Sequence, residues 1–284
     1  MTTPPTPQAP YQQQDWQAAS AALYASPIPL RRATLGDALA SEWTKIRSVR
    51  STMWTLGVMI VLLLGLGLLV ATTTNATDTD IGDVPVLSFG FFGVLLGSIC
   101  VITLGVMTIA SEYGTGLIRT TLTACPSRAR VLTAKAIVFF LLTFVITTVT
   151  TALVGALQTA ILGGVTPTGD EWLRATVGVG LYIAALGLLS LAVGALIRHS
   201  AGAITIMIGV VLLPLVAAMF MFSESLGDLQ QALFAYSIPS QLSAFYDTSV
   251  TGSGPSGWEP LWIMLGVAGV ALIGAYLSLE KRDV

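Results

Sequence analysis

Six long apolar runs constrain this chain of 284 residues more than any other feature of its sequence. A helix needs about 20 predominantly apolar residues to cross the hydrocarbon core of a bilayer. Inside a bilayer, the backbone polar groups of such a run must be hydrogen-bonded within the segment, so the runs fold as helices. The sequence therefore predicts an all-α, polytopic membrane protein with six transmembrane helices. We expect these spans at Met53–Ala71, Val86–Ala110, Ala136–Leu162, Leu173–Ile197, Ala201–Phe222 and Leu261–Leu279.

Composition agrees with this class. Hydrophobic residues make up 54% of the chain and charged residues 10%, whereas an average soluble domain has about 25% charged residues. We expect a lipid bilayer as the surrounding partner and no nucleic acid. The two cysteines, Cys100 in an apolar run and Cys125 in a basic loop, fall at different depths, and we expect both to be free.

Basic residues lie almost entirely on one side of the predicted spans. Twelve of the 13 lysines and arginines fall in the N-terminal region, the loop after the second span, the turn after the fourth or the C-terminal end. Only Arg174 falls in an opposite loop, and those loops carry nine acidic residues. Because loops rich in lysine and arginine remain in the cytoplasm, we predict a multi-pass protein of the cell (plasma) membrane with both termini cytoplasmic.

The polar, basic segment between the second and third spans, residues 107–135, has the pattern of a short helix at a membrane surface. Gly114 and Gly116 are expected to end the second span near Ala110, because glycine favours turns. Pro126 ends the segment that follows, because the residue before a proline is excluded from the helical region.

Between these breaks the residues have helical spacing. Leu117, Ile118, Thr121 and Leu122 share one apolar face, while Arg119, Thr120 and Thr123 point elsewhere. Ser127 is a candidate N-cap for the next helix. That helix carries Arg128, Arg130 and Lys135 into the third span.

This segment resembles the loop between spans two and three in the permease subunits of type-2 ABC exporters. The resemblance rests on residues 111–119 (SEYGTGLIR), Leu122, residues 126–128 (PSR) and Lys135. Residues 41–48 (SEWTKIRS), just before the first span, are similar to the interfacial helix of the same family.

The resemblance implies a cytoplasmic coupling helix between spans two and three that contacts a separate ABC ATPase subunit. The residues it assigns to ATPase coupling are Glu112, Tyr113, Gly116, Leu117, Ile118, Arg119, Leu122 and Arg128. Glu112 is expected at the end of span two, paired with a basic residue such as Arg47 or Arg128. There it would pass movement of the docked helix into the bundle.

The resemblance also implies an assembly, because six spans form half of a translocation pathway in that family. We expect two ATPase copies and a second permease copy, either identical or a paralogue. The permease interface is predicted to involve spans rich in small residues, such as span two with Gly90, Gly93 and Gly97, and span five.

Residues 31–52 predict an amphipathic helix at the membrane interface. Thr34 and Asp37 form a capping box, and an apolar stripe of Leu35, Ala38, Leu39, Trp43, Ile46 and Val49 follows. We assign Glu42, Trp43, Lys45 and Arg47 to this interfacial helix, with Trp43 at headgroup depth and the cations facing lipid phosphates. The alternative is a stop signal with no further role. Residues 1–30, rich in Pro, Gln, Ala and Ser, predict a disordered cytoplasmic tail, and residues 53–284 form the six-span domain.

The connection between spans five and six, residues 223–260, is long for a loop without structure. Its apolar residues need a surface to bury against, which predicts short re-entrant or interfacial helices at the outer mouth. The residues assigned to this mouth are Phe234, Tyr236, Pro239, Phe245 and Tyr246. Anchoring by aromatic residues alone is an equal alternative. In the resembling family this region caps the exit.

Polar groups inside the spans are few. Gln158 and the threonines of span three either bond to neighbouring helices and their own backbone, which we favour, or line a substrate path. No carboxylate is expected at mid-membrane.

The chain has no Walker A motif, because none of Lys45, Lys135 and Lys281 stands in the Gly-x-x-x-x-Gly-Lys-[Ser/Thr] pattern. We therefore expect no enzyme and no cofactor in this chain, with ATP and Mg bound by the partner ATPase. A lone His199 provides neither a metal cluster nor a triad. Three hypotheses remain: the permease subunit of an ABC exporter for an unidentified substrate, a non-transporting scaffold or immunity-type subunit, and an intramembrane enzyme. The first is favoured because it accounts for the coupling-like loop, and the third is disfavoured because no catalytic set is seen.

Overall fold

Helices make up the regular structure of the chain, and no strand occurs among residues 33–77, 82, 84–163, 166–248 and 254–281, which this computed structural model describes. Six segments there are long and apolar enough to cross a membrane. The all-α, six-span prediction is therefore confirmed. The tail predicted over residues 1–30 lies outside the described residues, as do residues 31 and 32 of the predicted interfacial helix.

The six spans follow one another along the chain, and the longest connection lies between the fifth and the sixth. They are α3 (Arg50–Ala76), η1 with α4 (Val86–Gly90 and Phe91–Thr115), α6 (Arg128–Leu162), α7 with the π-helical η2 and α8 (Gly169–Leu173, Arg174–Gly178 and Val179–Ile197), α9 (Ser200–Met219) and α12 (Glu259–Lys281). The shorter elements are α2 (Leu35–Ser48), α5 (Leu117–Ala124), η3 (Glu224–Leu226), α10 (Gly227–Tyr236), α11 (Ile238–Ser243) and η4 (Ala244–Tyr246).

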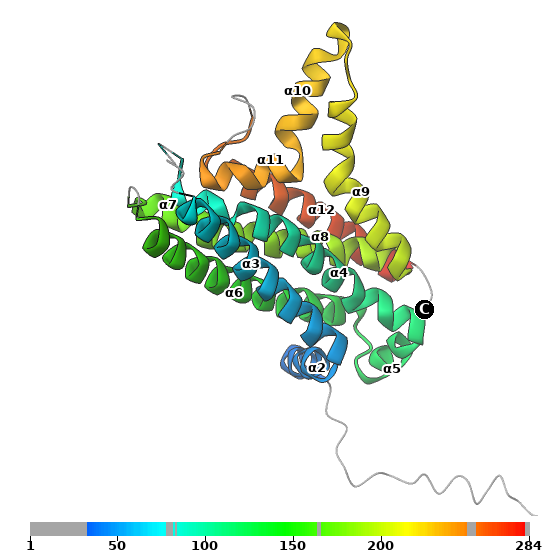
Figure 1. The fold of residues 1–284 in the computed structure, drawn as a ribbon. Helices are drawn as coiled ribbons and strands as arrows, with labels where there is room; N and C mark the ends of the chain where they lie inside the picture. Colours follow the sequence, from blue (N-terminus) through cyan, green and yellow to red (C-terminus); the bar gives the residue numbers. More distant parts are fainter. Residues whose placement is uncertain (1–32, 78–81, 83, 164–165, 249–253, 282–284) are drawn as a thin grey trace, which may run out of the picture. The chain divides into compact units, whose positions relative to one another are not determined.

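The core of the bundle lies between α4 and α8. Helix α8 packs against α4, α6, α9 and α12, and α3 packs against α4 and α6 (Figure 1). At Gly105 of α4 the two central helices come so close that an added Cβ would lie 2.6 Å from the carbonyl oxygen of Gly187 in α8. Helices in membranes rely on such small residues, because lipid tails offer no hydrophobic drive for helices to associate.

Gly105→Ala is therefore expected to destabilise the bundle by about 1–3 kcal/mol, as overpacking of a filled core does. The neighbour is backbone and cannot rotate away. The matched control is Gly266→Ala in α12, where an added Cβ meets nothing within 4 Å. Thermal unfolding of both variants in the same detergent measures the difference, and equal melting curves would contradict the close packing of α4 and α8.

Small residues of η1 and α4 also face the chain's own helices, which corrects the predicted permease interface. A Cβ at Gly93 would lie 2.9 Å from the carbonyl oxygen of Leu63 in α3, and one at Gly97 would lie 2.3 Å from the Leu63 side chain. Gly90 faces Val154 and Gln158 of α6. The prediction that these three glycines contact a second copy is wrong, because α3 and α6 already fill their side of the helix.

Polar side chains of α6 bond inside the bundle, as favoured from the sequence. The hydroxyls of Thr143 and Thr151 donate to backbone carbonyls one turn back, at 2.8 and 2.9 Å. Gln158 Nε2 donates to the carbonyl oxygen of Gly67 in α3, at 3.0 Å. This bond joins α6 to α3.

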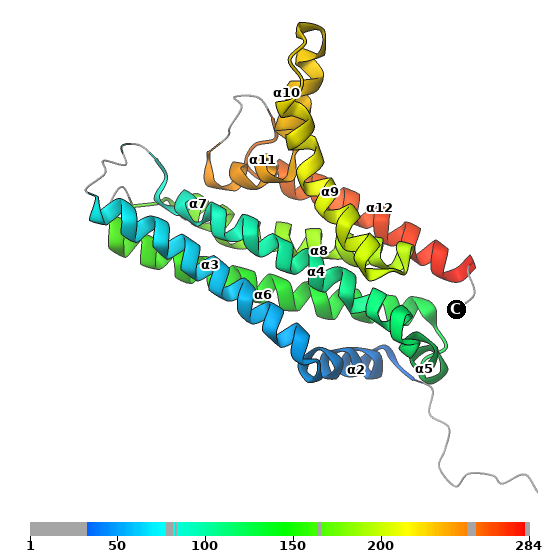
Figure 2. The same ribbon diagram turned by 45° about the vertical axis from the view of Figure 1, so that its right-hand side comes forward.

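Helices α9 and α10 form a hairpin that diverges from the other spans (Figures 1 and 2). Gln230 Nε2 of α10 donates to the carbonyl oxygen of Ala218 in α9, at 2.9 Å. The chain then returns through α11 and η4 toward α12. The connection between spans five and six therefore contains short helices, as predicted.

Candidate functional site

The chain turns sharply between α4 and α5. Helix α4 continues to Thr115, past the end expected near Ala110, because a glycine within a helix costs only about 1 kcal/mol and Gly114 is tolerated there. The break falls at Gly116 alone, which adopts the left-handed conformation with φ 74°. Glycine takes this conformation without steric cost.

The far end of α5 behaves as its sequence predicts. Cys125 is extended (φ −133°, ψ 92°) before Pro126. The Ser127 hydroxyl then accepts from Arg130 N and caps α6. Cys125 and Cys100 are both free. Helix α5 is thus a short element between two backbone breaks.

Beside α5, a buried cluster of four charged side chains joins three helices. Lys135 Nζ of α6 lies 2.8 Å from Glu42 Oε2 of α2 and 2.6 Å from Glu112 Oε1 of α4. Lys45 Nζ of α2 lies 2.8 Å from Glu42 Oε1 and 2.9 Å from Glu112 Oε1. We call these four residues the ion cluster. Its two carboxylates and two ammonium groups balance in charge.

The two lysines of the ion cluster differ in exposure. The side chain of Lys135 is 1% exposed and that of Lys45 is 36% exposed. Burial opposes the charge on Lys45, but hydrogen bonds to Glu42 and Glu112 outweigh it and raise the pKa of Lys45 above its ordinary value. Lys45 therefore stays charged at neutral pH and is the only partly solvated member.

The sequence suggested that Glu112 pairs with Arg47 or Arg128, but in the structure it pairs with neither. It contacts Lys45 and Lys135, and its second oxygen, Oε2, is buried without a hydrogen-bond partner among the described residues. Helical spacing could have identified Lys135 as a buried partner for Glu112. Val131, Lys135 and Val138 share one face of α6, and all three are buried. A lysine on an apolar face calls for a buried acid.

Three further cations at this end of the bundle reach backbone or aromatic groups. Arg128 donates to the carbonyl oxygen of Leu279 in α12. Arg130 donates to the carbonyl oxygen of Ala33, at 2.6 Å. The Arg198 guanidinium lies 4.9 Å from the ring centroid of Tyr113, a cation–π contact between the ends of α8 and α4. The first turns of α6 therefore hold the ends of α12 and α2.

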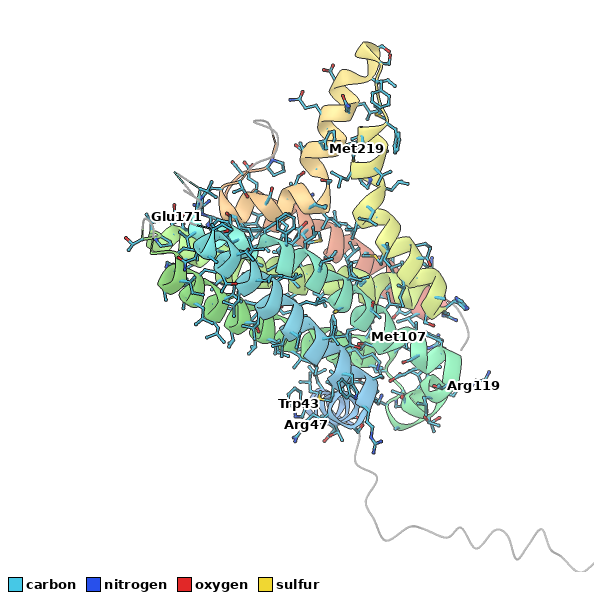
Figure 3. The ribbon with its side chains drawn as sticks, in the orientation of Figure 1. Trp43, Arg47, Met107, Arg119, Glu171 and Met219 are labelled. Carbon is cyan, nitrogen blue, oxygen red and sulfur yellow. The ribbon has the colours of Figure 1, made fainter. Side chains whose placement is uncertain are left out.

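Helix α5 turns its apolar face inward. Ile118 is buried, Thr121 and Leu122 are partly buried, and Leu117, Arg119, Thr120 and Thr123 are exposed. Figure 3 shows Arg119 projecting outward from α5. The predicted apolar face exists, but most of it packs against the chain itself.

Helix α2 begins with the capping box predicted at Thr34 and Asp37. It buries Glu42 and Ile46 and leaves Trp43 46% exposed. Arg47 is exposed as well and lies near Trp43 (Figure 3). Of the four residues assigned to this helix, Trp43 and Arg47 face outward, whereas Glu42 and Lys45 belong to the ion cluster.

The residues assigned to the outer mouth are not part of this cluster. Phe245 and Tyr246 are buried, Phe234 and Pro239 are partly buried, and Tyr236 is 57% exposed. The Phe245 ring meets Tyr182 edge-on with centroids 5.6 Å apart. Arg174 ties this region to α7, because it pairs with Asp247 at 2.5 Å and with Asp170 at 2.8 Å.

An apolar groove of about 340 Å³ lies between α4 and α9. Its walls include Leu95, Leu96 and Ile99 of α4 and Val211 and Leu212 of α9. Leu96 and Ile99 are each 42% exposed. The glycine face of α4 is covered by the chain's own helices, whereas this side of α4 is left partly open.

The six spans define a multi-pass helical membrane protein, and the end of its bundle beside α5 contains a buried ion cluster. A family model described as ABC-2 family transporter protein matches residues 38–216, and the chain belongs to this family. The match includes α5 and all four residues of the ion cluster. Members of the family are membrane components of ABC transporters and work with an ABC ATPase subunit. No curated protein matches the sequence.

Proposed function

We propose that this chain is the permease subunit of an ABC exporter, which moves an unidentified substrate across the cell membrane using ATP hydrolysed by a separate subunit. The observation that carries the proposal is α5, a short helix between two backbone breaks with one exposed face. Such an element can form a docking surface for a soluble partner, as a helix in a groove does. ATP and Mg would be bound by that partner.

Within this proposal, α5 is the coupling helix. Its contact surface would be Leu117, Arg119, Thr120 and Thr123, because Ile118 and Leu122 pack toward the chain itself. Of the residues carried over from the family resemblance, Leu117 and Arg119 would touch the ATPase, and Gly116 would provide the turn. Tyr113 and Arg128 would hold the neighbouring helix ends in place.

Glu112 would act through the ion cluster. It joins α4 to α6 through Lys135 and to α2 through Lys45. Three helices connected in this way would shift together when the docked α5 moves. This is the role in coupling that the sequence assigned to Glu112, with different partners.

The α5 end would face the cytoplasm, with both termini on that side. The side chains of Arg47, Arg50 and Arg119 are exposed there and make no hydrogen bond or ion pair within the described part of the chain. Free cations at one end favour contact with anionic lipid headgroups and with a soluble partner. Trp43 would lie at headgroup depth beside Arg47.

A second permease copy, identical or a paralogue, would complete the pathway. The open apolar groove between α4 and α9 is the surface that we assign to it, in place of the glycine face that α3 and α6 occupy. Two ATPase copies would follow from the two permease chains. At the opposite end, Phe234, Tyr236, Pro239, Phe245 and Tyr246 would cap the exit.

Affinity capture of the full-length chain from solubilised membranes of its host tests the proposal. We expect a captured polypeptide with a Walker A motif, and ATP hydrolysis by the captured complex. The matched sample is the same chain carrying Leu117→Asp, which should lose the ATPase. If the chain is purified in lipid nanodiscs without any such polypeptide, the scaffold or immunity-type hypothesis is favoured instead.

A further inference from the structure

The position of α5 depends on side chains, because its backbone is broken at both ends. Gly116 is left-handed and Cys125 is extended. Neither residue continues the helical hydrogen bonding of α4 or α6 through to α5. A short helix of this kind can reorient unless contacts from other elements hold it.

In the part of the chain that the structure describes, α5 is held by packing of the partly buried Leu122 and by two further contacts. The first is the Ile118 side chain, which is 5% exposed. The second is a hydrogen bond that Lys45 Nζ donates to Thr121 Oγ1, at 3.3 Å. The hydroxyls of Thr120 and Thr123 donate within α5 itself, to Leu117 and Arg119 carbonyls. Apolar packing of Ile118 and Leu122 keeps the helix against the bundle, and the directional hydrogen bond adds a restraint on its rotation.

Lys45 is also the removable member of the ion cluster. Lys135 already bridges Glu42 and Glu112 in a buried position. Lys45 repeats that bridge at the edge of the cluster with its side chain 36% exposed, so its transfer to water costs less. Among the residues that the structure describes, Lys45 is the one side chain that bonds to both carboxylates and to α5.

We propose that Lys45 is the positioning residue of α5: its ammonium group links the Thr121 hydroxyl to the Glu42 and Glu112 carboxylates and so sets the rotation of the helix that meets the ATPase. This inference rests on the function proposed above for α5. Loss of the link leaves α5 hinged at Gly116 and Cys125. The ATPase would then bind a helix that it must first orient, at a cost in affinity.

Spin-label spectra of the permease alone test the positioning role. The label is placed at Thr123→Cys, an exposed site on α5, in a chain with Cys100→Ala and Cys125→Ser. We expect Lys45→Met to increase the mobility of the label. Arg47→Met is the matched control, because Arg47 lies on the same helix and its side chain makes no hydrogen bond or ion pair within the described chain. The spectrum of this variant should equal the parent's.

Thr121→Val separates positioning from charge balance. It removes the hydroxyl at nearly constant shape and leaves the ion cluster intact, so the label should become as mobile as in Lys45→Met while the melting temperature changes little. Lys45→Arg should restore the parent spectrum. If the label stays immobile in Thr121→Val, or if Arg47→Met has the same effect as Lys45→Met, the inference is overturned.

Binding of the ATPase gives the second readout. A hydrogen bond to a charged group corresponds to about a tenfold change in the dissociation constant, and we expect that loss in both Lys45→Met and Thr121→Val. The spectra need no ATPase, so the two proposals can fail separately. If the label becomes more mobile in Lys45→Met and Thr121→Val while ATPase binding is unchanged, the docking role of α5 is contradicted and Lys45 is still its positioning residue.

Discussion

Replacing Lys135 with methionine is expected to lower the free energy of unfolding by about 3–5 kcal/mol, the cost of breaking a buried ion pair by removing one partner. Lys135 is 1% exposed and bonds to carboxylates of two other helices. Without it, two buried carboxylates share the single charge of Lys45. Thermal unfolding in detergent and the yield of monodisperse protein measure the effect.

Two further variants make this result specific. Lys281→Met removes an exposed lysine from the end of α12 and should leave stability unchanged, because surface charges contribute about 0–1 kcal/mol. Lys135→Met combined with Glu112→Gln restores the charge balance and should recover much of the loss. If Lys135→Met has the same melting temperature as the parent protein, the ion cluster does not hold α2, α4 and α6 together.

Leu117→Asp is expected to weaken ATPase binding by at least about 30-fold, which corresponds to the 2 kcal/mol of an interface hot spot. Leu117 is 55% exposed and is the first residue of α5. An acidic residue in the first turn of a helix is favourable, so α5 itself should remain folded. In a docked complex the new carboxylate would be desolvated without a partner.

The dissociation constant for the partner ATPase, measured with the purified permease in nanodiscs, checks this expectation. Thr44→Asp is the matched control, because it adds the same charge to an exposed position of α2 at the same end of the bundle. Its dissociation constant should be unchanged. Normal binding by Leu117→Asp would mean that α5 is a connection between spans and nothing more.

The ion cluster also changes what is expected of Glu112. A glutamate that pairs with a solvated arginine at the end of a span could be neutralised with little effect on assembly, because such exposed pairs contribute about 0–1 kcal/mol. In the structure it is buried and holds two lysines. Its substitution therefore affects stability as well as coupling, and activity must be compared at equal amounts of folded protein.

Local features of the chain were predictable from sequence because they depend on neighbours along it. Apolar runs of membrane length define the spans, Gly116 and Pro126 delimit α5, and Thr34 and Ser127 cap the helices that follow them. Each of these depends on a few adjacent residues and on the absence of water in a bilayer. The sequence also placed Arg128, Arg130 and Lys135 on the helix that leads into the third span. Their charge pattern alone did not reveal which groups they bind.

Only the tertiary structure decided which residues meet across helices. Lys135 lies 93 residues after Glu42 and 23 residues after Glu112 along the chain. No spacing rule brings α2, α4 and α6 together. The same holds for Gly93 and Gly97 of α4, whose spacing does not reveal that they face the chain's own α3. Periodicity shows that a helix has two faces, but burial of each face depends on the packing of distant segments, so the sequence determined the elements and the packing chose their partners.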